Sequence, residues 1–503
     1  MNETIVENFT NNSNPLQILR EKNFQVPPQS KLPEGDVDVA SLIRFMEQMN
    51  LPKFFMALPD GRQQSKTTYS LGSLALWAFA TCVFRQGAKN ALHTTLQGLS
   101  IEKRQGICRF LGITGTEVPH YTTVDDALAN VDCEKFNDIL LALFAQMNER
   151  KFFYNHAATL LPNGDYYIGT DGYHLHTYTQ PHAVDKHGHN ACPYCLPRKR
   201  HAGTEREVIY WVHTAVTFVL ICKNLTIPLF LYPLKSQQIN ANQSNDKLKQ
   251  ECELTAAHAV LPLIRNRFPK LKFTFLGDAL YANRPFLRLC AKLKMDYIIV
   301  RKEKTLTQLG RKCDELAKLK LYQTAYSHQE RVVRKKATIT RKARWFNNVE
   351  LGDGLATNVL RFEETAVNLN GEEKPQYKGE WICSKRLSKT NCIRESERGR
   401  MRWNHEDFHN TCKHRGFNIK HDMARANPNL LFVWKFMTCI AFFVFELFSH
   451  CTIAKKARGT RSLMKFAKDM LQELVNIAWA RIWESAILKK SKVQFRFCFE
   501  DGP

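Results

Sequence analysis

The pattern of apolar positions changes once along the chain, near residue 160. Between residues 36 and 149, apolar side chains recur at helical spacing in three segments, VASLIRFMEQM, SLGSLALWAFATCVFRQG and KFNDILLALFAQMNERK. Residues 1–35 are polar and contain Pro27, Pro28 and Pro33, which interrupt any helix. The pattern predicts a flexible leader (1–35) followed by an all-helical N-terminal domain (36–160).

Strand-like runs begin immediately after this region. They are rich in β-branched and aromatic residues, and two amphipathic helical segments separate the later ones. The expected strands are residues 166–168, 208–221, 225–234, 271–276 and 296–300, and the expected helices are residues 245–268 and 284–293. The first three strands predict an antiparallel meander. The order β-β-β-α-β-α-β is that of an RNase H-like fold.

Residues 320–385 interrupt this order with alternating, basic runs such as RVVRKKATITRKARWF, which predict an antiparallel β-rich insertion. A helix is expected over residues 395–414. The fold class is therefore α/β: an RNase H-like mixed sheet with helices, interrupted by the insertion and preceded by the helical domain. The core comprises residues 161–319 and 386–503, the latter including C-terminal helices.

Residues 430–451 form the one segment apolar enough to be mistaken for a membrane span. Lys435 and Glu446 fall inside it, and a charge at mid-span costs about 2.5–3.5 kcal/mol. The segment is therefore expected to be a helix buried between the sheet and another domain. A basic membrane-surface protein anchored by this segment is the alternative interpretation.

The net charge of +24 indicates a polyanionic partner, for which nucleic acid is the first candidate. The 15 cysteines are scattered, and the polar, Asn-rich start does not resemble a secretion signal. We therefore expect reduced thiols and a cytoplasmic, nucleoid-associated protein.

Three carboxylates carry the candidate chemistry. Asp171 follows the strand at 166–168, and Asp278 follows the strand at 271–276. Glu406 shares a helix face with Arg402 and Lys413, because at about 100° per residue the three lie within about 40° of one another. Taken singly, Asp171 is explained as a turn residue and Glu406 as half of a solvated ion pair.

The motifs around these residues resemble those of DDE transposases of bacterial insertion sequences. GTDGYH and FLGDALYAN are similar to that family's two aspartate motifs, and RMRWNHEDFHNTCKHRGFNIKHD is similar to the segment bearing its Y-R-E-K signature. Arg402, Glu406 and Lys413 match the last three signature positions. The tyrosine position is occupied by Gly399, so its contact is missing or supplied elsewhere.

The resemblance implies an enzyme that cuts element ends and joins them to target DNA. Asp171, Asp278 and Glu406 would be catalytic and hold two Mg²⁺ or Mn²⁺ ions. The implied partner is double-stranded DNA, and the protein is expected to bind it as a homodimer. No association with a membrane is expected. The candidate DNA-binding residues are Arg402, Lys413, Trp345, Arg301 and Lys302. Trp345 would stack on an unpaired base, but ordinary strand packing explains this residue better. A catalytically silent, domesticated relative that only binds DNA is the alternative.

The loop after the first strand contains a second constellation. Cys192 and Cys195 have the spacing of a zinc knuckle, and His201 and His213 would complete a tetrahedron. A polar loop with incidental thiols explains the same residues equally well. Any zinc here would be structural.

These interpretations predict a geometry. Asp171 and Asp278 should lie on neighbouring strands whose ends point the same way, with the Glu406 helix packed across that edge. The insertion should leave the core as a separate β-rich excursion and return beside the site.

Overall fold

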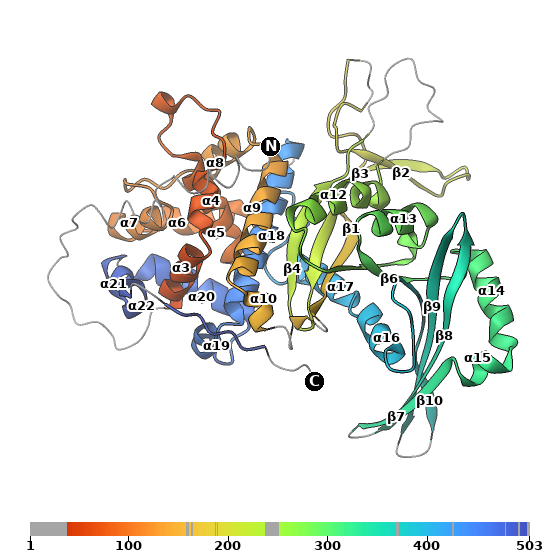
Figure 1. The fold of residues 1–503 in the computed structure, drawn as a ribbon. Coiled ribbons are helices and arrows are strands. Elements are labelled where there is room, and N and C mark those ends of the chain that lie inside the picture. The colour runs from red at the N-terminus through yellow and green to blue at the C-terminus, as the bar shows by residue number, and fades with distance from the viewer. Residues whose placement is uncertain are drawn as a thin grey trace.

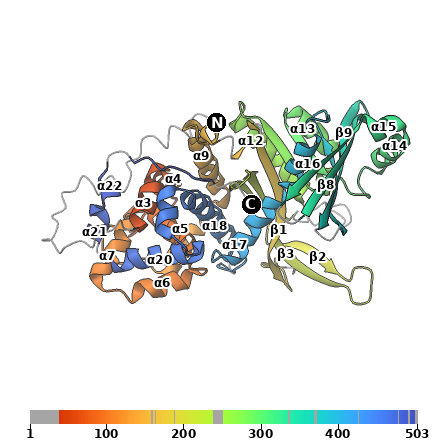
Figure 2. The same ribbon diagram turned by 90° about the horizontal axis from the view of Figure 1, so that it is seen from below.

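The computed structural model describes residues 38–499 except 157–159, 162–163, 187, 189, 237–250, 335–336, 369–371, 425–426, 478 and 491–492. The expected leader and the start of the expected helix at 245–268 lie outside the described residues. The described chain forms a helical body and a large mixed sheet with helices on both faces (Figures 1 and 2).

The N-terminal region is helical, as predicted. Its helices are α3 (Asp38–Gln48), α4 (Leu51–Met56), α5 (Leu71–Val83), α6 (Lys89–Gln97), α7 (Ile101–Phe110), α8 (Tyr121–Leu128), α9 (Phe136–Glu149) and α10 (Phe152–Asn155), with 3-10 turns η1 (Gln64–Lys66) and η2 (Cys133–Lys135). The most apolar of them, α5, is buried along its whole length and begins at Ser70, whose side chain accepts the Ser73 N–H.

Helix α18 (Pro428–Ser449) comes late in the chain and packs against the N-terminal helical region. It packs against α5, α9 and β4, so it lies between the helical body and the sheet, where it was expected. Among the described residues it is the one helix long and apolar enough to cross a membrane, and 94% of its most apolar window is buried inside the structure. The remaining C-terminal helices are α19 (Thr452–Arg458), α20 (Leu463–Asn476), α21 (Trp479–Glu484) and α22 (Ala486–Lys489).

The sheet has ten strands in the order β2-β3-β1-β5-β6-β10-β9-β8-β7, with β4 also paired to β3. Strands β1, β3 and β4 are antiparallel, as predicted, whereas β1, β5 and β6 are parallel. The strands are β1 (Tyr166–Tyr178), β2 (Leu196–Arg200), β3 (Val208–Ile221), β4 (Thr226–Pro233), β5 (Phe273–Gly277), β6 (Asp296–Val300), β7 (Ser327–Arg334), β8 (Ala337–Gly352), β9 (Leu355–Asn368) and β10 (Glu373–Cys383).

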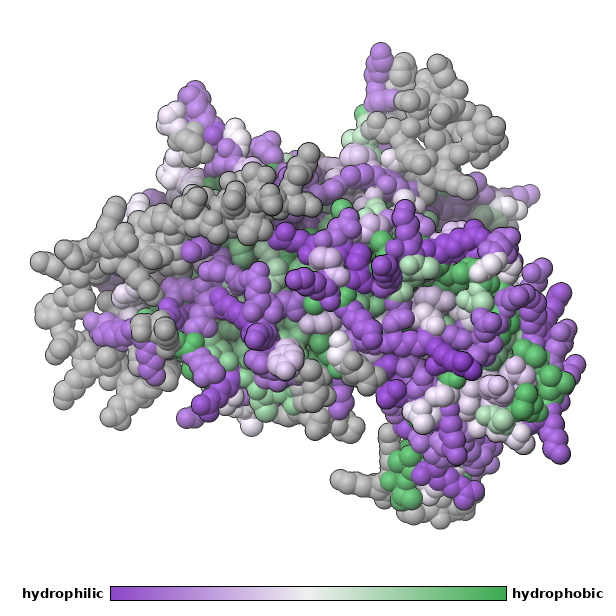
Figure 3. All heavy atoms as spheres, viewed as in Figure 1, coloured by the Kyte–Doolittle hydropathy of each residue, from purple (hydrophilic) through white to green (hydrophobic). Residues whose placement is uncertain are grey.

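Helices cover both faces of the central strands. Helices α12 (Glu253–Arg267) and α13 (Arg284–Lys292) pack on one face, and α16 (Cys392–Arg400) and α17 (Trp403–His414) pack on the other. Helices α14 (Thr307–Lys318) and α15 (Lys320–Thr324) lie beside the outer strands. Hydrophilic residues predominate among the coloured residues of the face seen in Figure 3.

Three expectations were wrong in detail. Strand β1 does not end before Asp171, because it continues to Tyr178 in antiparallel register with β3. The insertion is not a separate excursion, because β10 pairs with β6 and extends the same sheet. The helix expected over residues 395–414 is two helices, α16 and α17, which meet in a turn at Met401 and Arg402.

Candidate active site

The two aspartates lie side by side on neighbouring parallel strands. The β1–β5 register pairs Gly169 with Leu276. Two residues further along each strand, the same register brings Asp171 beside Asp278 on one face of the sheet. Asp278 immediately follows β5, and its Oδ1 accepts the Leu280 N–H at 2.9 Å, which fixes the carboxylate at the start of the η5 turn (Ala279–Tyr281). This part of the expected geometry is confirmed.

Helix α17 packs on the same face through two buried histidines. Thr217 stands directly opposite Asp171 in the β1–β3 ladder, and its hydroxyl lies 2.8 Å from Nε2 of both His405 and His409. Nδ1 of His409 in turn lies 3.7 Å from Oδ2 of Asp171. His409 is three residues after Glu406 on α17, so this docking brings the Glu406 face of the helix to the aspartates.

The pKa of Asp171 shows that the other two carboxylates lie near it. Burial raises its pKa to about 6; the Arg402 guanidinium opposes the rise, and the charges of Asp278 and Glu406 add to it. Arg402 also contacts Glu406 at 3.1 Å and lies 5.2 Å above the ring of Trp403, which is 55% exposed. Asp278 and Glu406 therefore both lie within electrostatic range of Asp171.

Glu253 is a fourth carboxylate at this site, and the sequence analysis missed it. A Cβ on Gly172 would lie 2.6 Å from Oε1 of Glu253, so the absence of a side chain there lets this carboxylate approach β1. Burial and the charges of Asp171 and Asp278 raise the pKa of Glu253 to about 7. No local pattern marks Glu253 in the sequence, because α12 begins 20 residues after β4 ends and its approach to β1 depends on the fold.

This donor set suits a hard divalent cation. Oxygen ligands that repel one another become stable together when a cation lies among them. His409 does not supply that charge, since burial and Lys413 lower its pKa to about 3 and keep it neutral. Among the described residues, no ion pair involves Asp278, and Arg402 is the cation that most lowers the pKa of Asp171.

The predicted DNA-binding residues lie in different environments. Arg301 is largely buried and paired with Glu380, whereas Lys302 is exposed, and both line a cavity of about 990 Å³ over the outer strands. Lys413 lies close enough to His409 to lower its pKa. Trp345 is only 3% exposed and packs against Tyr326, which agrees with strand packing and not with a base-stacking role.

Two aromatic residues that line the cavity, Tyr377 and Trp381, lie near α16, and the charges of Arg400 and Arg402 reach Tyr377. Tyr377 and Trp381 stack with their rings 6.0 Å apart, and the Arg400 guanidinium lies 4.5 Å above Tyr377. A Cβ on Gly399 would lie 2.5 Å from Nε1 of Trp381. The indole therefore occupies the space into which a tyrosine at position 399 would project.

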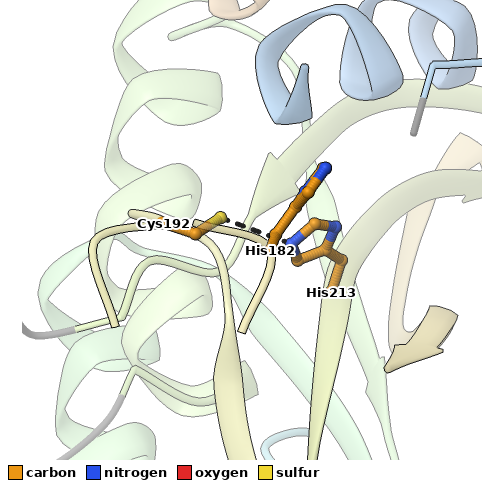
Figure 4. Close-up of side chains that lie close together, drawn as sticks. All are labelled: His182, Cys192 and His213. Carbon is orange, nitrogen blue, oxygen red and sulfur yellow. Dashed lines mark hydrogen bonds between the residues drawn. The ribbon is translucent and has the colours of Figure 1, made fainter. Parts of the chain in front are cut away.

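The cysteine and histidine residues form a second cluster, away from the carboxylates. The Sγ atoms of Cys192 and Cys195 lie 3.4 and 3.2 Å from Nε2 of His213. His201 does not join them; it is exposed beyond the end of β2, with a positive φ of 52°. His182 takes its place beside Cys192 and His213 (Figure 4). The choice of His201 was therefore wrong, and the other three residues do come together.

Comparison with protein-family models gave no match for this chain, and comparison with curated protein sequences gave none either.

The packing of Gly399 generates the first prediction. Gly399→Ala should destabilise the protein by about 1–3 kcal/mol, because the new methyl group overpacks against the buried Trp381. Gly98→Ala is the matched control, since nothing lies within 4 Å of a Cβ there. Urea unfolding of both variants measures the difference, and equal stabilities would contradict the packing described for position 399.

The raised pKa of Asp171 generates a second prediction, on how stability depends on pH. A carboxyl whose pKa rises from 3.8 to about 6 on folding makes the folded state bind the extra proton, so stability falls as pH rises through that window. The rise corresponds to about 3 kcal/mol, which the 32% exposure of the side chain reduces to about 1–2 kcal/mol. Asp171→Asn should therefore stabilise the metal-free protein at pH 8 and not at pH 3.5. Thermal unfolding at both pH values measures this; a variant less stable at pH 8 contradicts it.

Proposed function

We propose that this protein is a DNA transposase of the DDE type, built on an RNase H-like core. The observation that carries the proposal is the convergence of Asp171, Asp278 and Glu406 from three separate segments onto one face of the sheet. The motif resemblance and the net charge of +24 support the same function. The substrate is double-stranded DNA at the element ends and at the target, and two copies of the chain act together on it in the cytoplasm.

The three carboxylates are the residues that would hold two Mg²⁺ or Mn²⁺ ions. When bound, such ions activate the attacking water or 3′-hydroxyl and stabilise the leaving oxygen. The protein supplies rigidity: the β1–β5 register fixes the aspartates, and the two bonds to Thr217 fix α17. Arg402 orients Glu406 through one oxygen, Oε1, and leaves the other for a different partner.

A path for the phosphate backbone follows from the basic and aromatic residues. It runs from the cavity lined by Lys302 and Tyr377 to Arg400 and Arg402 at the carboxylates. Tyr377 supplies the phenol that position 399 lacks, since its ring lies under the Arg400 guanidinium and within the electrostatic range of Arg402. Exposed Trp403 provides an aromatic surface beside the site.

One observation favours a second candidate, a catalytically silent DNA-binding relative. The Arg402–Glu406 ion pair gives the charge of Glu406 a partner without a metal. A membrane-surface protein receives no such support, because α18 buries 94% of its most apolar window within the structure.

Single carboxylate variants test the catalytic proposal. Asp171→Asn, Asp278→Asn and Glu406→Gln should each reduce strand cleavage by more than about 100-fold, which exceeds the loss expected from an outer-shell partner. DNA binding should change little, since each variant alters one charge. Asp407→Asn is the control: it is exposed and adjacent to Glu406 on α17, and should cleave normally. The assay is cleavage of DNA carrying the flanking ends of the protein's own gene, with Mg²⁺ or Mn²⁺, beside a gel-shift measurement.

Two outcomes would reject parts of this assignment. Normal cleavage by any of the three variants removes that residue from the catalytic set. Binding of the end DNA by the wild-type protein without cleavage under any metal condition supports the silent relative.

The charge excess makes a separate prediction. Affinity for DNA should fall steeply between 50 and 200 mM salt, by about 10³-fold or more if six or more phosphates are neutralised. Fluorescence anisotropy with a labelled duplex measures the slope. Affinity that stays constant over this range would show that the basic residues serve another partner.

A further inference from the structure

The sulfur–nitrogen distances at His213 are close to those of a tetrahedral metal site. Bonds of about 2.3 Å to sulfur and about 2.05 Å to nitrogen, at a tetrahedral angle, separate the two ligand atoms by roughly 3.6 Å. The two sulfur–Nε2 distances to His213 are 3.4 and 3.2 Å. Ligand atoms of His182, Cys192 and His213 all lie within 4.8 Å of one another; Cys195 lies outside this group of three but contacts His213, so it is the fourth ligand.

Hydrogen bonds alone do not account for this arrangement. Nε2 of His213 has one position in the ring plane for a proton or a lone pair, yet two sulfur atoms approach it. Both ring nitrogens of His182 are buried without a well-formed hydrogen bond, and its nearest thiol is that of Cys192. The two cysteines and His213 are at most 1% exposed, and both thiols are free. Several buried sulfur and imidazole nitrogen atoms thus lie together without adequate hydrogen-bond partners, which indicates that they bind a ligand.

The backbone around the cysteines is already ordered for two thiolates. The His182 N–H donates to Sγ of Cys195 at 3.3 Å, which stabilises negative charge on that sulfur. The Asn190 side chain accepts the Cys192 N–H and donates to the Cys195 carbonyl, at 3.0 and 3.2 Å. These bonds fix the positions of the two sulfur atoms relative to each other.

We propose that Cys192, Cys195, His213 and His182 bind one Zn²⁺ in a closed Cys₂His₂ site that holds the base of the β2–β3 hairpin. Two thiolates and two imidazoles select zinc over Mg²⁺, which prefers oxygen. Binding displaces the two thiol protons to solvent and leaves a site without net charge. Four protein ligands leave no position for substrate, so the ion is structural.

The shape and charge of the β2–β3 hairpin explain why a structural ion at its base would be useful. It projects from the sheet and carries three consecutive basic residues, Arg198, Lys199 and Arg200 (Figure 1). Between β1 and β2, one isolated bridge, Val184 with Asn190, is the only strand pairing among the described residues. Arg198 lies close enough to His174 on β1 to lower its pKa, so the hairpin base borders the strand that carries Asp171. Zinc would hold this basic arm in a fixed direction from the site.

Metal analysis of the full-length protein tests the proposal. Protein purified under reducing conditions without chelator should contain one zinc per chain by mass spectrometry. Cys192→Ser, Cys195→Ser and His182→Ala should each lose it. His201→Ala and Cys252→Ser are the matched controls, a histidine of the same hairpin and an exposed cysteine elsewhere, and both should retain it.

A cobalt measurement removes the ambiguity of a misfolded variant. Wild-type protein reloaded with Co²⁺ should show the visible bands of a tetrahedral site and thiolate-to-cobalt charge transfer, which His182→Ala should alter and His201→Ala should not. Chelation should speed tryptic cleavage after Arg200 and Arg206 several-fold. Wild-type protein that neither contains zinc nor binds cobalt overturns the site, and loss of metal in His201→Ala but not in His182→Ala overturns the ligand assignment. Asp171→Asn should keep its zinc, so the result is independent of DNA cleavage.

Discussion

The parallel pairing of β1 with β5 is the constraint on which the site depends. Side chains alternate between the faces of a sheet, so a slip of one residue would send Asp171 and Asp278 to opposite faces. The other components are positioned from this pairing. Thr217 is fixed opposite Asp171 and docks α17, while Gly172 opens the other face to Glu253. A site assembled from four distant segments thus derives its precision from one hydrogen-bond register.

The sequence predicted the structure correctly where the local residue pattern and the long-range contacts favour the same conformation. The strand order and the neighbouring aspartates could be predicted because buried strands have a recognisable composition and polar residues follow them. The extension of β1 past Asp171 could not, because Gly172 signals a turn locally and only pairing with β3 overrides it. The break at Met401 and Arg402 was not predicted either, although Gly399, a poor helix former, stands just before it. His182 and His201 are equally plausible from spacing; the fold of the loop decides between them.

The β-rich insertion shows that net charge alone does not identify the residues of a binding surface. Arg341 contacts Glu330, Glu364 and Glu397, and Arg361 contacts Asp314 and Glu380. These arginines are committed to holding the outer strands together. The cations free to meet a phosphate are therefore a subset of the basic residues, and continuity of β10 with β6 joins that surface to the carboxylates.

The position of α18 also bears on how the chain becomes folded during synthesis. Its partner α5 is made more than 340 residues earlier, because α5 ends at Val83 and α18 begins at Pro428. Helices α4 and α8 cover part of α5 early, but the side of α5 that packs against α18 stays uncovered until α18 emerges from the ribosome, so the helical body is incomplete until then. A ribosome that stops within the β-rich insertion would release a chain with that surface exposed, a natural substrate for chaperones and proteases. The helix that separates the two halves of the finished molecule is thus also the one that determines when the first half is complete.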